Sequence, residues 1–309
     1  MQQVAGLKIG PLIIKRSKVT FMNIEVQIVN AFVYNNQGGN PAGVVLDADF
    51  LSYEQKLTIA RKAAVSETAF VSRSSMADFK LEFFTPNRQI AHCGHATIAT
   101  FSYLAQLNRI PDAHTSKETI DGRREIIMKG DLAFMEQKSP KYLEPISLYP
   151  KILESLGIAS HNLLNSSISL VNTGNSFLVV PLRSMAILKN LRPNLKLIEE
   201  VSEELDLIGF YPFTLETFVA GHDASSRMFG PRYAIPEEAG TGMAAGPLAA
   251  YLYDRLGIQK QHMLIEQGWC KDPPSPSIIE IDLEIFSNKI QGIMAGGKGI
   301  VSNRLNIEI

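Results

Sequence analysis

The chain has 309 residues, of which 45% are hydrophobic and 20% charged, so it can bury a large core and has the composition of a globular protein. Its formal net charge of −1 gives no general attraction to nucleic acid or to an anionic membrane. The two cysteines make neither a disulfide framework nor a zinc-binding spacing. These properties predict a cytoplasmic protein that has neither nucleic acid nor a membrane as a partner.

The N-terminal half reads as strand-rich. Residues 1–22 lack the uninterrupted apolar block of a signal peptide, and we expect them to be a disordered N-terminal extension. Ser52 with Gln55 is a capping-box signature, which predicts the start of a helix. Alternating apolar residues and turn signals predict the other elements. In chain order we expect a strand at 24–32, a strand at 44–46, a helix from 53 to 64, strands at 65–71 and 79–84, and a helix that starts near 93–95 and runs to 104.

The C-terminal half repeats this kind of pattern. We expect a short helix near 152–156, strands at 168–171 and 177–180, an amphipathic helix at 198–205, a strand at 213–220, a helix from 241 to 257, and strands at 263–267, 278–283, 290–295 and 300–301. The last two strands are separated by Gly296-Gly297. The pattern indicates an α+β chain with one principal helix in each half.

Two sequence echoes suggest that the halves are related. Residues 39–45 (GNPAGVV) resemble residues 174–180 (GNSFLVV). The stretch from 84 to 96, which begins FTP and ends CGHA, resembles the stretch from 229 to 244, which begins FGP and ends TGMA. The echoes occur in the same order, so we expect two matched halves with one exposed helix start in each.

A helix start binds anions because its first backbone N–H groups are unpaired and lie at the positive end of the dipole. Cys93-Gly94-His95 places a thiol, a flexible joint and an imidazole at such a start. The sequence has no phosphate-binding glycine motif, no Gly-x-Ser-x-Gly elbow and no metal-ligand cluster. Of the chemistries considered, only proton transfer by side chains is left for this site. Glu67 follows the end of a predicted helix, where the dipole is expected to raise a carboxyl pKa.

Several motifs taken together resemble the PhzF-like isomerases of phenazine biosynthesis. They are GNPA at 39–42, SETAF at 66–70, FTP at 84–86, CGHAT at 93–97, SRMFGP at 226–231, TG at 241–242 with Ala244, IEQG at 265–268 and GG at 296–297. The resemblance runs from about residue 23 to the C-terminus. It implies the diaminopimelate epimerase-like fold, an α+β architecture of two pseudo-symmetric domains, each a curved sheet around a central helix. The expected domains are 23–135, completed by a C-terminal strand at about 298–309, and 136–297.

The resemblance also implies roles for individual residues. Glu67 matches the family's acid/base glutamate, which moves a proton between carbons of an unsaturated acid, and His95 matches the histidine that assists it. The residues expected to contact the substrate are Asn40, Cys93, Gly94, Glu238, Thr241, Gly242 and Met243. The family implies catalysis without a metal or organic cofactor, a small carboxylate-bearing substrate, and a homodimer. We expect Arg227 to form a structural ion pair rather than to bind substrate.

The second half departs from the family pattern. The family's aspartate is replaced by Glu238, its serine by Met243 and its histidine by Ala245. Met243 cannot donate a hydrogen bond, which predicts a less polar ligand on that side. Two alternatives stay open: an amino-acid epimerase or dehydratase of the same fold, for which a thiol would be expected where Thr241 stands, and a small-molecule-binding paralogue with impaired catalysis.

Overall fold

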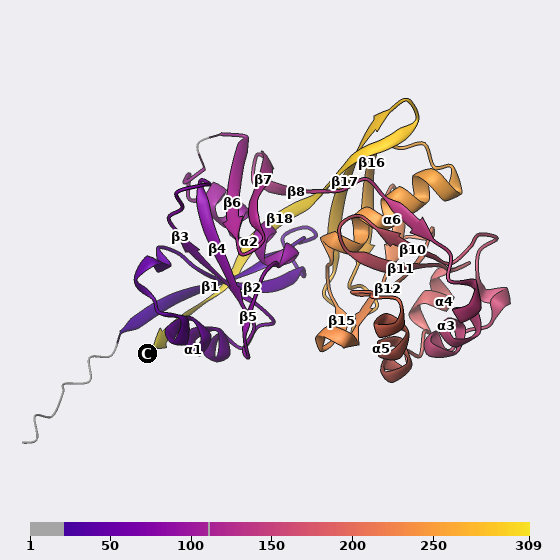
Figure 1. Ribbon diagram of the computed structural model, residues 1–309, viewed down its shortest axis with the longest axis horizontal. Coiled ribbons are helices and arrows are strands. Elements are labelled where there is room, and N and C mark those ends of the chain that lie inside the picture. The colour runs from indigo at the N-terminus through magenta and orange to yellow at the C-terminus, as the bar shows by residue number, and fades with distance from the viewer. Residues whose placement is uncertain (1–21, 111) are drawn as a thin grey trace, which may run out of the picture.

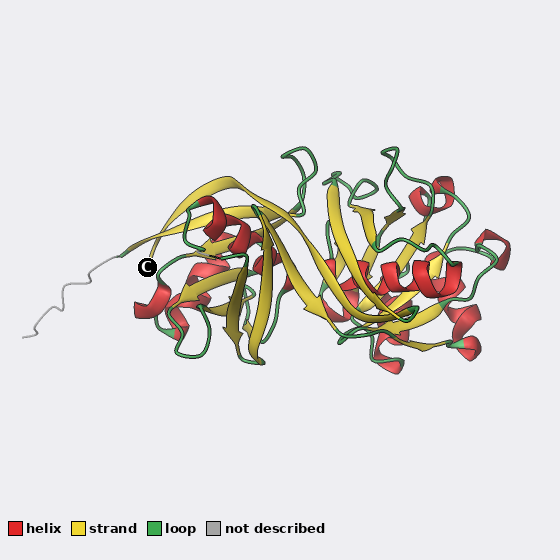
Figure 2. Cartoon of the chain, turned by 90° about the horizontal axis from the view of Figure 1, so that it is seen from above, coloured by secondary structure: helices red, strands yellow, loops and turns green. Residues whose placement is uncertain are grey.

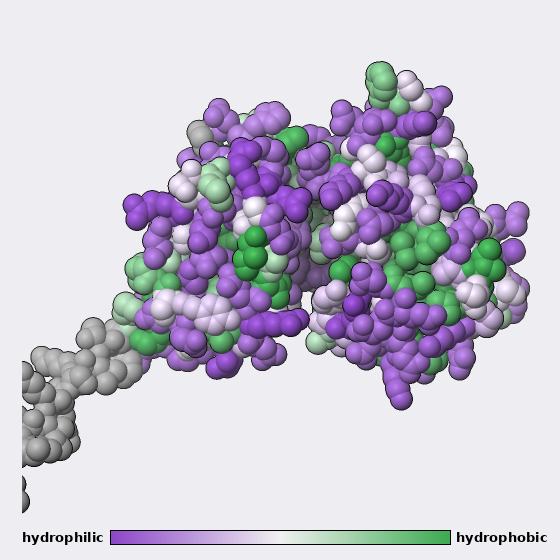
Figure 3. Space-filling model, in the orientation of Figure 1, coloured by the Kyte–Doolittle hydropathy of each residue, from purple (hydrophilic) through white to green (hydrophobic). Residues whose placement is uncertain are grey.

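The structure is a computed structural model that describes residues 22–110 and 112–309, so all of the predicted extension except Met22 lies outside the described residues. The chain forms two lobes of mixed α and β structure, arranged side by side (Figure 1). One face of the molecule is mainly hydrophilic and is hollowed between the lobes (Figure 3). In the part of the chain that the structure describes, no helix is long and apolar enough to cross a membrane.

The N-terminal lobe is built from antiparallel and parallel strands around one buried helix. That helix is α2 (Gly94–Gln106), and α1 (Tyr53–Ala63) lies on the outside (Figure 1). The predicted capping box starts α1: Ser52 Oγ accepts from the Gln55 N–H at 3.3 Å, and Gln55 Oε1 accepts from the Ser52 N–H at 2.9 Å. The strands are β1 (Asn23–Ala31), β2 (Asn40–Val45), β3 (Thr68–Ser72), β4 (Phe79–Phe84), β5 (Gln89–Ile90), β6 (His114–Thr119), β7 (Gly122–Lys129) and β8 (Leu132–Gln137).

The C-terminal lobe has the same kind of organisation around α6 (Gly242–Leu256). Its other helices are α3 (Tyr149–Leu156), α4 (Met185–Lys189) and α5 (Leu195–Glu204). Its strands are β9 (Lys141–Leu143), β10 (Ser169–Asn172), β11 (Ser176–Pro181), β12 (Gly209–Thr214), β13 (Ala224–Ser226), β14 (Met228–Gly230), β15 (Ile235–Glu238), β16 (His262–Gln267), β17 (Ser277–Phe286) and the first part of β18 (Lys289–Glu308). Both α2 and α6 bury apolar residues on all sides, which is typical of a helix in the centre of a fold.

The long strand β18 connects the two lobes (Figures 1 and 2). Its beginning pairs with β17, its middle with β8, and its end with β1, all antiparallel. The prediction of two strands separated by Gly296-Gly297 was wrong, because both glycines lie inside the continuous strand. A Cβ atom at Gly296 would lie 2.2 Å from the carbonyl oxygen of Ala133, so a residue without a side chain is needed where β8 crosses.

The order of elements in the first lobe recurs in the second. An antiparallel pair, β1–β2 or β10–β11, comes first, and a helical crossover leads to a parallel neighbour, β3 beside β2 or β12 beside β11. A short strand, β5 or β15, then precedes the buried helix. The paired sequence echoes therefore lie on matching strands and at matching helix starts.

The segment after β12 corrects another expectation. A strand was predicted at 213–220, but β12 ends at Thr214 and a loop follows. Glu266, which is fully buried on β16, accepts hydrogen bonds from the N–H groups of Phe218 and Val219, each at 2.8 Å. A carboxylate therefore takes the place of a neighbouring strand as the acceptor for this backbone, and local apolar alternation does not reveal such an arrangement.

Candidate active site

Glu67 lies between α1 and β3, one residue before the strand rather than inside it as predicted. Its carbonyl oxygen accepts from the Gly43 N–H of β2 at 2.9 Å, which fixes the backbone beside the neighbouring strand. Its side chain is only 11% exposed, and Oε2 lies 3.2 Å from Nε2 of His95. The carboxyl group is thus held against the start of α2.

His95 is the second residue of α2 and contacts carboxylates through both ring nitrogens. Nε2 faces Glu67, and Nδ1 lies 3.3 Å from Oε1 of Glu238 on β15. The thiol of Cys93 is also near, with Sγ 3.7 Å from Nδ1. The imidazole, which is 6% exposed, therefore joins an acidic residue of the first lobe to one of the second.

These contacts set the protonation of the three buried groups. Burial lowers the pKa of His95, but Cys93 and the carboxylates of Glu238 and Glu67 outweigh burial and raise it well above its ordinary value. Burial raises the pKa of Glu67, but the contact with His95, helped by Ser66, leaves it below its ordinary value. The expectation of a raised Glu67 pKa was therefore wrong, because the neighbouring imidazolium outweighs the effect of burial. Burial raises the pKa of Cys93, which keeps the thiol protonated.

Glu238 is held by residues from both lobes. Asn40, at the start of β2, donates to Oε1 of Glu238 at 2.9 Å and to the carbonyl oxygen of Gly240 at 2.9 Å. The Thr241 hydroxyl donates to Oε2 of Glu238. Gln267 accepts from the Thr241 N–H at 3.0 Å and donates to the Glu238 carbonyl oxygen at 2.8 Å. Asn40, Glu238 and Thr241, which the sequence singled out, thus form one network around His95.

The starts of α2 and α6 lie against each other. A Cβ atom at Gly94, the first residue of α2, would lie 3.3 Å from Cγ of Met243, the second residue of α6. Neither helix has a side-chain cap, because Cys93 and Thr241 make no capping hydrogen bond, whereas Ser52, Ser184 and Asn194 cap α1, α4 and α5. Two helix starts without side-chain acceptors therefore converge, with the Met243 side chain between them.

Glu67, Cys93 and His95 are also a possible metal-ligand group in the described part of the chain. One ligand atom from each lies within 4.8 Å of the others, although the sequence predicted no metal cluster. The thiol lies beside Nδ1 and the Glu67 carboxylate beside Nε2, so the imidazole turns a different nitrogen to each. A metal ion binds one ring nitrogen and needs a deprotonated thiol. The arrangement fits proton exchange better than metal binding.

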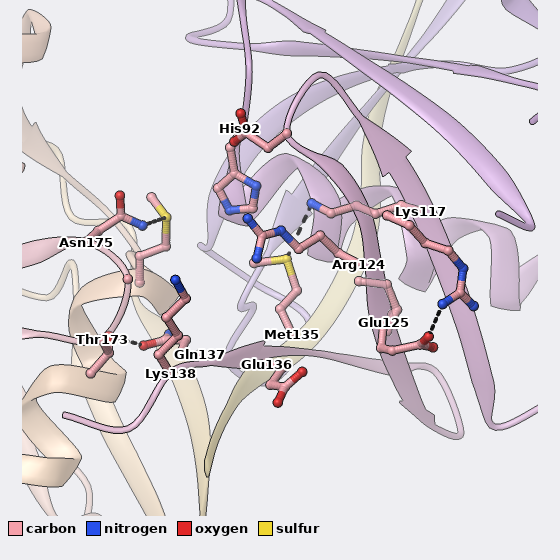
Figure 4. A pocket seen from close by; sticks show the side chains of 15 residues that line it. His92, Lys117, Arg124, Glu125, Met135, Glu136, Gln137, Lys138, Thr173 and Asn175 are labelled. Atoms are coloured by element: carbon pink, nitrogen blue, oxygen red, sulfur yellow. Dashed lines mark hydrogen bonds and ion pairs between the residues drawn. The ribbon is translucent and has the colours of Figure 1, made fainter. Parts of the chain in front are cut away.

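A pocket of about 560 Å³ lies beside Met243, between residues of both lobes (Figure 4). Met135 of β8 and Met243 form its apolar wall, and Asn175 donates to the Met243 sulfur at 3.5 Å. The rest of the lining is largely charged or polar: His92, Lys117, Asp121, Arg123, Arg124, Glu125, Ile126, Glu136, Gln137, Lys138, Thr173 and Gly174. The loss of a serine at Met243 did not reveal these charged neighbours, and the expectation of a less polar ligand on the Met243 side stays a prediction.

One other prediction concerned Arg227, and two residues of the pocket were not predicted. Arg227 is bidentate to Glu237, with both N–O distances 2.8 Å, and it lies outside the network of His95. Lys117 and Met135 were missed. Lys117 lies on β6, where residues 115–117 are all buried, so the alternation that would mark an inward side chain is absent. Its neighbours Ser116 and Glu118 are polar, so no pattern in the sequence marked Lys117 as a pocket residue.

Known proteins resemble this chain along most of its length. The family profile for phenazine biosynthesis-like proteins (PhzC-PhzF) matches residues 29–303. An uncharacterized isomerase of Bacillus subtilis, YfhB, is 32% identical over 287 residues, covering 88% of this chain and 94% of its own. The trans-2,3-dihydro-3-hydroxyanthranilate isomerase of Pseudomonas chlororaphis is 29% identical over 292 residues, covering 90% and 96%.

Solved structures extend the likeness to the fold. The crystal structure of the PhzF-family phenazine biosynthesis protein of Bacillus anthracis superposes with a TM-score of 0.85 at 26% identity, covering 93% of this chain and 100% of that one. A hydroxyproline epimerase from Agrobacterium vitis superposes with a TM-score of 0.55 at 12% identity, covering 93% of both, which is a likeness of fold alone. The chain has an epimerase-like fold and belongs to the phenazine biosynthesis-like (PhzC-PhzF) protein family.

Proposed function

We propose that the protein is a cofactor-independent isomerase that moves a proton, and with it a double bond, on a small carboxylate-bearing substrate. The substrate would lie between two pseudo-symmetric domains, residues 23–135 completed by 298–309, and residues 136–297. The observation that carries this proposal is the buried contact between Glu67 and His95 at the start of α2. A carboxylate, an imidazole and two uncapped helix starts meet there, and each has a role in such a reaction.

Glu67, ionised because its pKa is lowered, takes a proton from a substrate carbon. The electrons of the broken C–H bond enter the neighbouring double bond and the carboxylate-stabilised π system. The helix-start N–H groups at Gly94 and Gly242 stabilise the charge that develops. Glu67 then returns the same proton to a different carbon, which shifts the double bond and leaves the atoms unchanged in number. His95 holds the Glu67 carboxylate in place and shares the proton.

The relatives support this class of reaction. The Pseudomonas chlororaphis relative is named for an isomerisation of a dihydroaromatic acid. We expect a different substrate here, since Met243 lies between the helix starts where the family pattern has serine. The homodimeric state and the cytoplasmic location are further proposals. Sedimentation of the purified protein tests the first, and fractionation of cells that express it tests the second.

Two other functions compete with the proposal. An epimerase with a thiol on each side of the substrate would need a cysteine at the start of α6, where Thr241 instead donates its hydroxyl to Glu238. A binding protein with impaired catalysis is favoured by one observation, the close approach of Met243 to Gly94, which narrows the space at the helix starts. Glu67 and His95 in contact favour the isomerase over both.

Deuterium exchange separates these functions. The protein is incubated in D2O with a panel of small unsaturated acids and amino acids, and proton NMR follows deuterium uptake at carbon. We expect uptake into an unsaturated acid that falls at least about a hundredfold in Glu67→Gln and is unchanged in Glu54→Gln, an exposed residue of α1. Exchange confined to the α-carbon of an amino acid would favour the epimerase, and binding without exchange would favour the binding protein.

A further inference from the structure

Lys117 is an unusual residue of the pocket beside Met243. Its side chain is fully buried, yet it lines the pocket. Nζ donates to the Thr97 hydroxyl at 2.7 Å and lies 3.7 Å from the Met135 sulfur, a weak acceptor. Thr97 in turn donates its hydroxyl hydrogen to the Cys93 carbonyl oxygen at 2.7 Å. Since an ammonium has three donors, at least one N–H of Lys117 has no strong acceptor among the described residues.

No carboxylate among the described residues forms an ion pair with Lys117. Nζ lies 5.2 Å from the centroid of the Phe83 ring, but such a contact offsets only part of the cost of burying an ammonium without a carboxylate partner. Burial accordingly lowers its pKa to about 7, an effect that Arg124 strengthens and that Asp121 opposes. His92, on the neighbouring turn, is neutral because burial and Lys117 lower its pKa to about 3. An anion that binds from solution would therefore stabilise the charged form of Lys117.

The rest of the pocket is compatible with such an anion. Arg124 and Lys138 also line the pocket (Figure 4); both are exposed to solvent and form no ion pair within the described chain. Arg123 is paired with Glu125. The acidic residues Asp121 and Glu136 also line the pocket and are exposed to solvent, whereas Lys117 is the buried charge at its inner end. The local field at that end therefore favours a negative group.

Two methionines separate this pocket from the helix starts. Cγ of Met243 and Cε of Met135 lie 3.3 and 3.7 Å from the position that a Cβ atom would take at Gly94, and both side chains line the pocket. Methionine is flexible and changes rotamer easily. A shift of the Met243 side chain would join the pocket to the place where the proposed substrate carboxylate meets α2 and α6. The volume of about 560 Å³ is within the usual range for small-molecule sites.

We propose that the Lys117 pocket is a subsite for a second anionic group, so that the substrate is a small molecule with two anionic groups, one at the helix starts and one on Lys117. This inference rests on the proposed function, since it concerns the same substrate. The second group is a carboxylate or a phosphate-type group, both of which accept hydrogen bonds from an ammonium. The size of the pocket and the single buried ammonium at its inner end fit one compact anion.

The test compares ligands that differ in the second anion. Isothermal titration calorimetry measures binding of butyrate, succinate, glutarate, adipate and 3-phosphonopropionate to the full-length protein. We expect at least one dianion to bind at least about tenfold more tightly than butyrate, and we expect Lys117→Met to remove that preference. Lys129→Met is the matched control, because Lys129 lies on the adjacent strand β7 and pairs with Asp282 outside the pocket. The order of the diacids and the phosphonate identifies the kind of anion.

A second measurement needs no variant. Because anion binding raises the pKa of Lys117, the wild-type protein should take up a proton when a dianion binds at pH 7.5. Titrations in buffers of different ionisation enthalpy report this uptake, and butyrate should show none. The groups that face Lys117 from the surrounding elements are Cys93, Asp121, Arg124 and His92. Of these, His92 is neutral and Cys93 protonated at this pH, so neither contributes uptake.

The outcomes separate the subsite from the isomerase. Equal binding of all ligands, or a dianion preference that Lys117→Met leaves unchanged, overturns the subsite even if deuterium exchange is found. Dianion binding that depends on Lys117 supports the subsite even if no acid exchanges, in which case only the isomerase proposal fails. Where exchange is observed, Lys117→Met should raise KM for a dianionic substrate far more than it lowers kcat.

Discussion

Glu67 and His95 form a buried contact at the boundary between the lobes, with the carboxylate oxygen Oε2 3.2 Å from the ring nitrogen Nε2. The second ring nitrogen of His95 faces Glu238, so one imidazole is placed between two acidic residues from different lobes. The chemistry proposed for the site and the contact between the lobes therefore depend on the same imidazole.

Glu67→Gln should lower the pKa of His95, because it removes one of the two carboxylates that favour the imidazolium. The folded-state pKa of His95 lies above its unfolded value of about 6.5. The stabilisation it gives is therefore complete below pH 6.5 and is lost as the pH rises through the folded pKa. NMR titration of His95 and urea unfolding at several pH values measure both effects. An unchanged His95 pKa would contradict the assignment.

Gly94 and Met243 should be energetically coupled. Gly94→Ala adds a Cβ atom 3.3 Å from Met243 Cγ, so the methionine has to shift, and we expect a cost of about 1 kcal/mol in the free energy of unfolding. In a Met243→Ala background the same change should be neutral or slightly stabilising, because alanine is the better helix former. Urea unfolding of the four proteins gives the coupling energy, expected at about 1 kcal/mol. A value near zero would mean that the helix starts do not touch.

Lys117→Met should stabilise the protein in a pH-dependent way. The unfolded chain keeps the lysine proton up to about pH 10.5, whereas the folded chain loses it above about pH 7. The penalty is therefore complete below pH 7 and disappears between pH 7 and pH 10.5. We expect the variant to exceed wild type by about 2–4 kcal/mol at pH 6, and by much less at pH 10. Lys129→Met, tested in parallel, should lack this trend. The same trend in both variants would show that Lys117 is not the cause.

Arg227→Met should affect stability but not catalysis. The substitution leaves Glu237, whose side chain is 17% exposed, without its bidentate partner, and we expect a loss of about 3 kcal/mol. Adding Glu237→Gln should recover part of that loss, since no unpaired charge then remains. The rate of deuterium exchange should equal that of wild type under conditions in which both proteins are folded. A selective loss of exchange would instead assign Arg227 to substrate binding.

Local sequence patterns predicted the elements that carry the site. The Ser52–Gln55 capping box started a helix as expected, and the echoed stretches fell on matching strands and helix starts. Two strand predictions were wrong because contacts with residues distant in the sequence override the local pattern. Glu266 holds the backbone that had been predicted as a strand, and Gly296 continues a strand that glycine had seemed to interrupt.

The sequence by itself determined the family and the helices and strands next to the site, because these depend on motifs and periodicities within short stretches. It also singled out Glu67, His95, Asn40 and Glu238, but not how they meet. Only the tertiary structure decided that His95 lies between two carboxylates, that Met243 touches Gly94, and that Lys117 points into a pocket without an ion-pair partner in the described chain. The physical reason is that pKa values, close contacts and unpaired charges arise from residues far apart in the chain, and packing alone brings them together.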